Sequence, residues 1–348
     1  ELLKTASFNE KSLPKSSKTS RKDIIEKLRH SYKNEKLVFV LGAGLSMSYG
    51  LPSWNTLLQK LMVTTIENER SASNALSKLF TEIFAPSPLI AGRYLQKFYE
   101  TNNHSFEEAV RKVMYSEFDI NKPSELMSEI IRFCVAAGKS PNLDSIITYN
   151  FDDLVEQHLK SISSIEIPYK SIYGVGMNPE PGELPIYHVH GYLPKAGKLT
   201  EDNQITFGES IYHKQYSDIY SWNNIVQINK FRDFNCLFMG TSLTDPNIRR
   251  LLDIAKLQKG KSKEYHFIFK KRYSENDVSI SLESLLQQNK ILLDEKSKAN
   301  LNFGETVKFL IKTIESFEEN DSSSFGVKTI WVDEYSEIPE ILNEVRTE

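Results

Sequence analysis

The segment LVFVLGAGLSMSYGLPSW, residues 37–54, decides the fold. A strand is expected over Lys36–Leu41, which is apolar at every position after Lys36. Such a run is typical of a strand buried on both faces of a parallel sheet. The turn Gly42-Ala43-Gly44 follows, and Pro52-Ser53 then opens a helix. The apolar face of that helix has helical spacing and consists of Trp54, Leu57, Leu58, Leu61 and Met62.

The same combination of a strand, a turn and a polar cluster returns three times, at Ser145–Asp153 (SIITYNFDD), Ile186–Gly191 (IYHVHG) and Cys236–Pro246 (CLFMGTSLTDP). Two later apolar segments, Tyr265–Phe269 and Lys328–Val332, supply further strands. Strands that alternate with helices predict an α/β fold, Rossmann-like and doubly wound, with a mainly parallel sheet. Because such a sheet binds its ligand beyond the carboxyl ends of its strands, we expect the four segments to meet in one crevice suited to a dinucleotide.

The chain is expected to form one domain with an N-terminal tail and a helical insertion. Residues 1–22 are rich in Lys, Ser and Thr and predict a mobile tail. Residues 23–348 then form the ligand-binding catalytic domain. Within it, residues 70–140 carry helical patterns without strong strand signals, which predicts a helical insertion that covers the sheet. Lys195–Tyr212 is interpreted as a loop or hairpin.

Composition excludes several classes of protein. The net charge is −3, so there is no general electrostatic basis for binding nucleic acid. No apolar run approaches the ~18 residues that span a bilayer, and no signal-peptide pattern is present, so we expect a cytoplasmic protein. The two cysteines, Cys134 and Cys236, cannot build a four-ligand zinc site.

Glycine-rich turns are the first candidates for ligand binding. Gly42 and Gly44 permit a tight turn, Ala43 permits close approach of the backbone to a phosphate, and Ser46 can donate a hydrogen bond. A simple packed turn is an equally good interpretation of these residues alone. The segment Gly240-Thr241-Ser242 offers hydroxyls and N–H groups at another strand end, or it is an ordinary turn before a helix capped by Asp245.

Asn150 and His190 are the candidates for chemistry. Asn150 follows a strand and can hold a ribose hydroxyl or orient a water, although an asparagine there more often caps a helix. Its neighbours Asp152 and Asp153 fit either interpretation. His188 and His190 alternate about Val189, so they face opposite sides. We assign His188 to packing and His190 to the crevice, because Gly191 ends the strand next to it.

One late segment has two interpretations as well. Trp331–Tyr335 ends a strand and could lie against an adenine, or it could simply belong to an edge strand.

Taken together, these pieces resemble the sirtuin-like (SIR2) family over about residues 30–345. The matching motifs are GAG-x-S with GLPSW, TYNFD at Thr148–Asp152, HG at His190–Gly191, and GTSL at Gly240–Leu243. The resemblance implies an NAD-binding Rossmann-like sheet in which Asn150 and His190 are the catalytic pair at the nicotinamide ribose. It also implies the residues that bind NAD: Gly42, Ala43, Gly44, Ser46, Pro52, Trp54, Thr148, Asp152, Gly240, Thr241 and Ser242.

Departures from the family pattern narrow the expected function. Protein-deacetylating sirtuins carry a four-cysteine zinc module, which this chain cannot form, and have Phe-Arg where this chain has Ser53-Trp54. Their asparagine follows a glutamine, whereas Asn150 follows Tyr149. These changes resemble the bacterial anti-phage SIR2 branch, whose members hydrolyse NAD to nicotinamide and ADP-ribose.

That branch implies a homo-oligomer that acts with a partner such as a HerA-type ATPase or another defence-system protein. The competing hypothesis is a module that senses NAD or ADP-ribose without turnover. A protein deacetylase is less favoured because the zinc module is missing.

Overall fold

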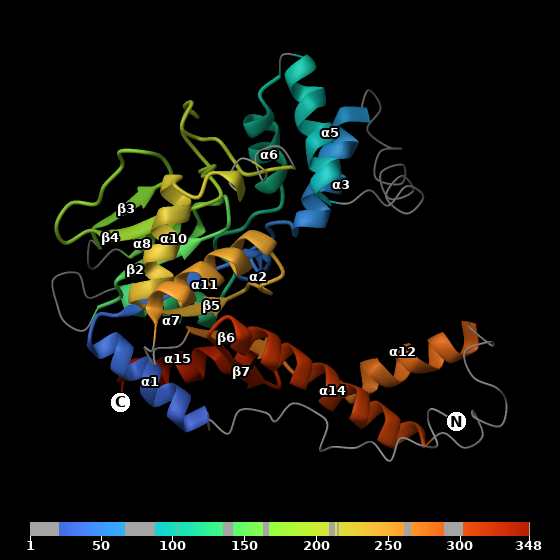
Figure 1. Cartoon of the computed structure of the whole chain (residues 1–348). Helices are drawn as coiled ribbons and strands as arrows, with labels where there is room; N and C mark the ends of the chain where they lie inside the picture. Colours follow the sequence, from blue (N-terminus) through green and yellow to red (C-terminus); the bar gives the residue numbers. More distant parts are fainter. Residues whose placement is uncertain are drawn as a thin grey trace.

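Seven parallel strands form one sheet in the computed structural model, which describes residues 21–66, 88–102, 104–134, 142–162, 167–208, 213, 216–260, 266–288 and 302–347. The strand order is β3-β4-β2-β1-β5-β6-β7 (Figure 1). In chain order the strands are β1 (Leu37–Leu41), β2 (Ser145–Thr148), β3 (Tyr169–Ile172), β4 (Leu184–His188), β5 (Asn235–Met239), β6 (His266–Lys271) and β7 (Val327–Val332). The predicted α/β fold class is confirmed.

The central strand β1 shows why its sequence is apolar throughout. It pairs in parallel with β2 on one side and β5 on the other, with Val40 opposite both Ile147 and Phe238. Leu37 and Phe39 belong to the hydrophobic core on one face of the sheet, and Val38 and Val40 belong to the core on the other. Because successive side chains of a strand point to opposite faces, a strand covered on both sides has to be apolar at every position.

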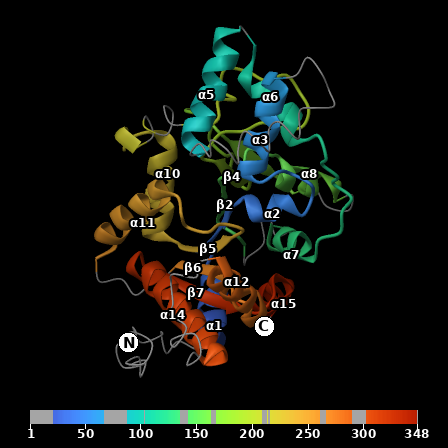
Figure 2. The ribbon, with the colours of Figure 1, turned by 90° about the vertical axis from the view of Figure 1, so that its right-hand side faces the viewer.

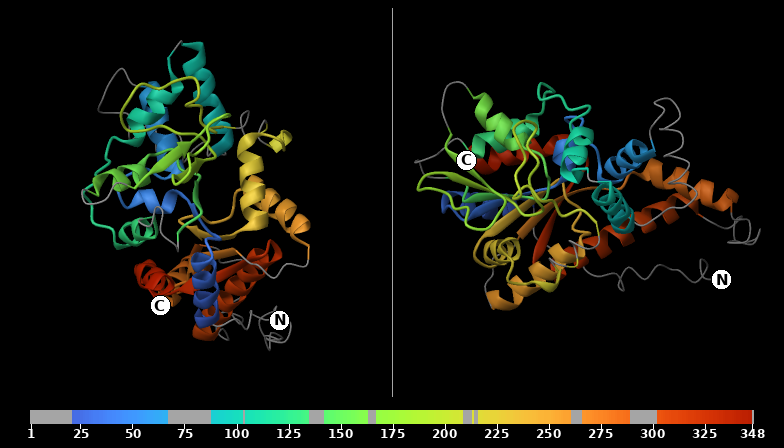
Figure 3. Two further views of the ribbon diagram at one scale, coloured as in Figure 1. Left: turned by 90° about the vertical axis from the view of Figure 1, so that its left-hand side faces the viewer. Right: turned by 90° about the horizontal axis from the view of Figure 1, so that it is seen from above.

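Helices cover both faces of the sheet (Figure 2). One face packs against α1 (Arg21–Lys33), α7 (Glu125–Cys134), α8 (Leu154–Ser161) and α15 (Ile338–Thr347). The opposite face packs against α10 (Trp222–Asp233) and α11 (Pro246–Lys259). The long helix α14 (Phe303–Ser324) contacts β7. Helix α12 (Glu275–Gln288) packs against α14 and extends away from the sheet (Figure 3). A short 3-10 helix, η1 (Tyr335–Glu337), precedes α15.

A third hydrophobic core lies beyond one end of the sheet. It is built from α3 (Trp54–Ile66), α5 (Pro88–Thr101) and α6 (Phe106–Met114), with Phe207 buried among them (Figure 1). Part of the segment expected to be a helical insertion, residues 70–87, 103 and 135–140, lies outside the described residues. Its described helices divide between two cores, because α5 and α6 pack on α3 whereas α7 packs under the sheet.

Two features of the fold differ from the expectations, and one segment that had two interpretations is placed. The strand β3 was not predicted, since its four residues, YKSI, include one buried side chain, Ile172. Residues 43–47, expected to begin as a turn, form the short helix α2 (Ala43–Met47). The segment Trp331–Tyr335 ends β7 at the edge of the sheet, separated from β1 by two strands, so of its two interpretations the edge strand is the one observed.

No helix in the described ranges is both long and apolar enough to cross a bilayer.

Candidate functional site

Four adjacent strands bring the four sequence segments together. One candidate residue follows each strand: Gly42 follows β1, Asn150 follows β2, His190 follows β4 and Gly240 follows β5. These strands are neighbours in the sheet, in the order β4-β2-β1-β5. Since the strands are parallel, all four segments emerge at the same edge of the sheet. A pocket of about 600 Å³ lies there and is lined by residues from every one of them.

Most of the sequence-predicted site residues line this pocket. Those that do are Gly42, Ala43, Ser46, Pro52, Trp54, Asn150, Asp152, His190, Gly240, Thr241 and Ser242. Gly44 and Thr148 do not. Gly44 lies against the backbone of Gly240, and Thr148 is buried with its hydroxyl accepting a hydrogen bond from the N–H of Asn150 at 3.1 Å.

Other pocket residues were not predicted as site residues. Thr206 and Gly208 come from the segment interpreted as a loop or hairpin, which has no motif that would reveal them. Asp245 was expected only as a helix cap, and it is one, since its carboxylate accepts hydrogen bonds from the N–H groups of Asn247 and Ile248. The remaining unpredicted residues are apolar or aromatic for the most part: Leu51, Leu57, Met114, Tyr149, Phe151, Thr244, Pro246 and Ile248.

The glycines of the site allow two loops to touch. A Cβ on Gly42 would lie 2.5 Å from the carbonyl oxygen of Gly240, and a Cβ on Gly44 would lie 3.0 Å from the Gly240 Cα. The Gly44 N–H donates a hydrogen bond to that carbonyl at 2.9 Å. Gly240 itself has φ +70°, a conformation that favours glycine. Glycine is therefore required at these positions because the loops after β1 and β5 are in close backbone contact.

Asn150 is held by its side chain and does not cap a helix. The residue at the N-cap of α8 is Asp153. The Asn150 amide nitrogen donates to the Gly42 carbonyl at 3.1 Å and to the Ser46 hydroxyl at 2.9 Å. Both amide hydrogens are used, so the side-chain oxygen is the atom of this amide that can accept a hydrogen bond from a ligand.

His190 lies in the turn directly after β4, and the backbone around it is closely constrained. Its carbonyl accepts a hydrogen bond from Thr206 N–H at 2.6 Å, and the next residue, Gly191, has φ +107°. The ring meets Tyr149 edge-on at 4.9 Å between centroids, and the Tyr149 hydroxyl donates to Gln227 at 2.6 Å. Tyr149 therefore fixes the imidazole from one side.

The His190 imidazole is suited to accepting a proton. Burial lowers its pKa, and the nearby Asp245 carboxylate opposes that change only in part. The ring is consequently neutral at neutral pH. Its Nε2 atom is buried and has no hydrogen-bond partner among the described residues.

Asp152 is a second titratable group of the pocket. Burial raises its pKa to about 6, although hydrogen bonds from Ser46 and from the Leu154 N–H act in the opposite direction. The site thus contains a carboxyl group that changes charge close to neutrality, which is a common feature of functional sites.

This raised pKa predicts a pH effect on stability. The folded chain binds the Asp152 proton more tightly than the unfolded chain, whose carboxyl has a pKa near 3.8. The free energy of unfolding should therefore fall as the pH rises from about 4 to about 6, and the cost should persist above that range. Relative to the parent, Asp152→Asn should be more stable at pH 7 than at pH 4 by about 2 kcal/mol, measured by urea unfolding. Asp202→Asn is the control for removal of an exposed charge, and an equal difference at both pH values would show that Asp152 titrates normally.

An aromatic wall encloses the other side of the pocket. The Trp54 ring packs against Phe207 with centroids 4.4 Å apart and approaches Phe151 at 6.3 Å. Leu57 of α3 and Met114 of α6 complete this wall. The helices of the third core thus supply the apolar side of the pocket, while the strand ends supply its polar side.

The described residues contain no group of three or more His, Cys, Asp and Glu side chains placed to hold a metal ion. Both cysteines are buried, Cys134 in α7 and Cys236 in β5, and burial raises the pKa of each thiol.

Comparison with known proteins gives matches to one family. The family model of the SIR2-like domain matches residues 144–293. The protein named NAD(+) hydrolase ThsA from Enterococcus faecium is 24% identical over 332 residues, which cover 94% of this chain and 58% of that protein. The proteins of the same name from Bacillus cereus (strain MSX-D12) and Acinetobacter baumannii (strain 532279) are 19% and 21% identical, over 89% and 93% of this chain and 54% and 56% of their own lengths.

The chain thus spans little more than half the length of the curated relatives it matches. The domain match begins at the start of β2 and includes the segments that carry Asn150, His190 and Gly240. The match covers less than half of the chain, and over that region this chain is similar to the SIR2-like domain.

Proposed function

We propose that this chain is an NAD glycohydrolase that cleaves NAD and water to nicotinamide, ADP-ribose and a proton. The observation that carries the proposal is the presence, in one pocket, of an anchored asparagine amide and a neutral histidine. The buried Nε2 of that histidine has no hydrogen-bond partner in the described part of the chain. The names of the relatives, NAD(+) hydrolase, support the same substrate and reaction.

Each side chain has a defined part in the proposed reaction. The bond between the ribose C1′ and nicotinamide breaks, nicotinamide leaves with the bonding electrons, and C1′ gains oxocarbenium character. The Asn150 oxygen accepts a hydrogen bond from a ribose hydroxyl or from the attacking water and so fixes their positions. His190 accepts the proton that the water or a ribose hydroxyl gives up as the new C1′–O bond forms.

The surrounding residues support this chemistry. Trp54 and Phe151 give one side of the pocket an apolar surface, and a low local dielectric strengthens the electrostatic interactions within it. The hydroxyls of Thr241 and Ser242 are proposed to hold a ribose or phosphate of the remainder of NAD. Ala43 and Ser46 line the pocket next to them and are assigned to the same task.

We propose further that the activity serves anti-phage defence by depleting NAD, and that the chain works as a cytoplasmic homo-oligomer with a partner such as a HerA-type ATPase. The helices α5 and α6 are proposed as the contact surface or as a lid. Unrestrained NAD cleavage would poison the host cell, which is the reason to expect a controlling partner. Light scattering with and without a co-purified partner tests assembly, and a monomer with full constitutive activity would contradict it.

Incubation of the purified chain with NAD tests the proposed reaction. We expect nicotinamide and ADP-ribose to appear in equal amounts, measured by chromatography, and the rate to be unchanged by a metal chelator. Elemental analysis should find no stoichiometric zinc. Binding of NAD without release of nicotinamide, also in the presence of the partner, would instead support a sensing module. One tightly held zinc per chain with deacetylation of an acetyl-lysine peptide would support a deacetylase.

A further inference from the structure

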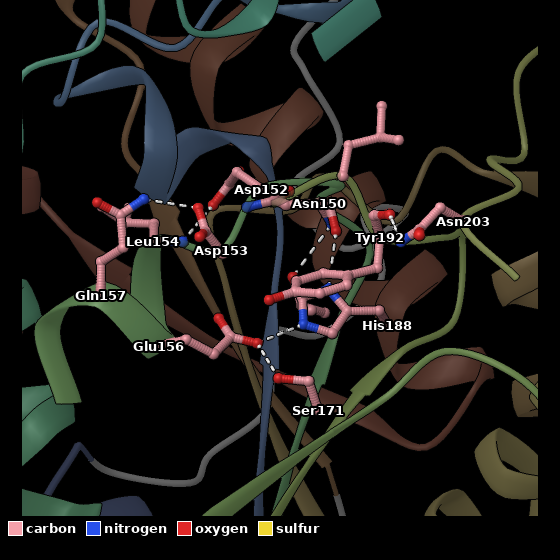
Figure 4. Close-up of polar contacts among 12 residues, drawn as sticks. Asn150, Asp152, Asp153, Leu154, Glu156, Gln157, Ser171, His188, Tyr192 and Asn203 are labelled. Atoms are coloured by element: carbon pink, nitrogen blue, oxygen red, sulfur yellow. Dashed lines mark hydrogen bonds and ion pairs between the residues drawn. The ribbon is translucent and has the colours of Figure 1, made fainter. Parts of the chain in front are cut away.

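A buried pair of side chains, Glu156 and His188, lies behind Asn150, outside the pocket lining. Glu156 of α8 and His188, the last residue of β4, face each other with 2.6 Å between Glu156 Oε1 and His188 Nε2 (Figure 4). Their side chains are 3% and 1% exposed. Two ionisable groups removed from water to this extent require a specific arrangement of protons.

The hydrogen bonds of Glu156 indicate that it is ionised. Its Oε1 atom also accepts a hydrogen bond from the Ser171 hydroxyl at 2.8 Å, so two donors converge on one oxygen. Burial alone would raise the pKa of Glu156, but the charge of His188 and the hydrogen bonds from His188 and Ser171 outweigh it, and the pKa is lowered. The partner of a buried carboxylate at this distance is a protonated Nε2.

The second nitrogen of His188 faces Asn150. His188 Nδ1 lies 3.5 Å from the Asn150 carbonyl oxygen, a long hydrogen bond. A carbonyl oxygen can only accept, so this contact is favourable only when Nδ1 carries a hydrogen. A His188 ring with hydrogens on both nitrogens makes both of these contacts as a donor, and the ring packs against Tyr192 with centroids 4.3 Å apart.

We propose that Glu156 and His188 are positioning residues, in which the imidazolium of His188, held by Glu156, fixes the Asn150 peptide and thereby the Asn150 side chain in the pocket. This inference rests on the proposed function of Asn150. It completes the set of contacts that hold this residue: the N–H donates to Thr148, the side-chain amide donates to Gly42 and Ser46, and the carbonyl accepts from His188. Every direction except that of the side-chain oxygen is then fixed by the protein.

The proposal predicts a loss in turnover more than in binding. Loss of the hydrogen bond from His188 to the Asn150 carbonyl allows the Asn150 side chain to move from its reactive position. A displacement of about 1 Å costs up to about 100-fold in rate. Glu156→Gln should lower kcat for nicotinamide release by about 10- to 100-fold with KM for NAD changed less than about threefold. Ser171→Ala removes the other hydrogen bond to the same Glu156 oxygen without a contact to Asn150, and it should keep kcat within about threefold of the parent.

Two double variants separate positioning from general packing. Asparagine at 188 places its amide near the position of Nδ1, whereas glutamine places its amide near the position of Nε2. In the Glu156→Gln background, which leaves no buried carboxylate unpaired, His188→Asn should therefore have a higher kcat than His188→Gln. Equal kcat values in the two double variants, with equal melting temperatures, would overturn the proposal.

Nitrogen-15 NMR of the histidine-labelled chain gives a readout that does not depend on turnover. At pH 7 the parent should show two protonated ring nitrogens for His188, assigned by their loss in His188→Gln, and Glu156→Gln should retain only one. A single protonated nitrogen in the parent would overturn the inference. If the parent releases no nicotinamide at all, the proposed function fails, while the protonation of His188 is still decided by this spectrum.

Discussion

His190→Ala is expected to reduce nicotinamide release by about 10³-fold, because it removes the proposed proton acceptor of the pocket. The side chain makes one ring contact, with Tyr149, and its Nε2 has no partner in the described part of the chain, so the fold should persist. Circular dichroism and thermal unfolding would verify that the variant is folded, and chromatography of nicotinamide would measure the rate.

An exposed histidine provides the control for this prediction. His104 precedes α6 and lies outside the pocket, so His104→Ala should keep the activity of the parent. Asn150→Ala should inactivate to a similar extent as His190→Ala. Asn150→Ala should also lower the free energy of unfolding by about 1 kcal/mol, because the hydrogen bonds from the Asn150 amide to Gly42 and Ser46 are lost. Turnover by His190→Ala within a few-fold of the parent would remove this residue from the mechanism.

Gly240→Ala should destabilise the fold by about 3 kcal/mol, from a combination of backbone strain and a steric clash. Gly240 has φ +70°, and its added Cβ would lie 2.7 Å from the Leu45 nitrogen and 2.9 Å from the Gly42 carbonyl oxygen. These neighbours are backbone atoms at the centre of the sheet edge, so relief requires separation of the two loops that line the pocket. Urea unfolding would measure the loss, and NAD turnover should fall with it.

Gly260→Ala is a control, since Gly260 has φ +63° and an added Cβ would meet no atom of the described residues within 4 Å. It shares the positive φ and lacks the clash, so its cost should be smaller, about 1 kcal/mol. The difference between the two variants measures the requirement for close approach of the loops. Equal losses would mean that the contact between the loops after β1 and β5 does not constrain residue 240.

Six of the seven strands, and the edge of the sheet at which the pocket lies, could be predicted from the sequence. Apolar strands followed by polar turns identified the segments of Gly42, Asn150, His190 and Gly240, because buried parallel strands and their carboxyl ends leave local patterns. The assignment of His188 to packing also agrees with its burial beside Glu156. Such predictions succeed where one strand and the turn after it determine the result.

Features that depend on contacts between distant segments were not predictable in this way. Gly42 and Gly44 were expected to permit a tight turn, either beside a phosphate at Ala43 or as a simple packed turn. Their close contact with the backbone of Gly240, almost 200 residues later, arises only in the folded chain. The bond from the Tyr149 hydroxyl to Gln227 and the position of Thr206 in the pocket likewise arise only when the chain is folded. The raised pKa of Asp152 is a property of its burial, which no local pattern reveals.

The central claim is that NAD binds across the carboxyl ends of β4, β2, β1 and β5 with its nicotinamide ribose at Asn150 and His190. A crystal structure of His190→Ala in complex with intact NAD tests it most directly, since this variant should bind NAD without cleaving it. We predict the nicotinamide ribose within hydrogen-bond distance of the Asn150 side-chain oxygen, with C1′ next to residue 190 and the rest of the dinucleotide against Gly240–Ser242. NAD bound outside this pocket, or with C1′ out of reach of both residues, would contradict the account.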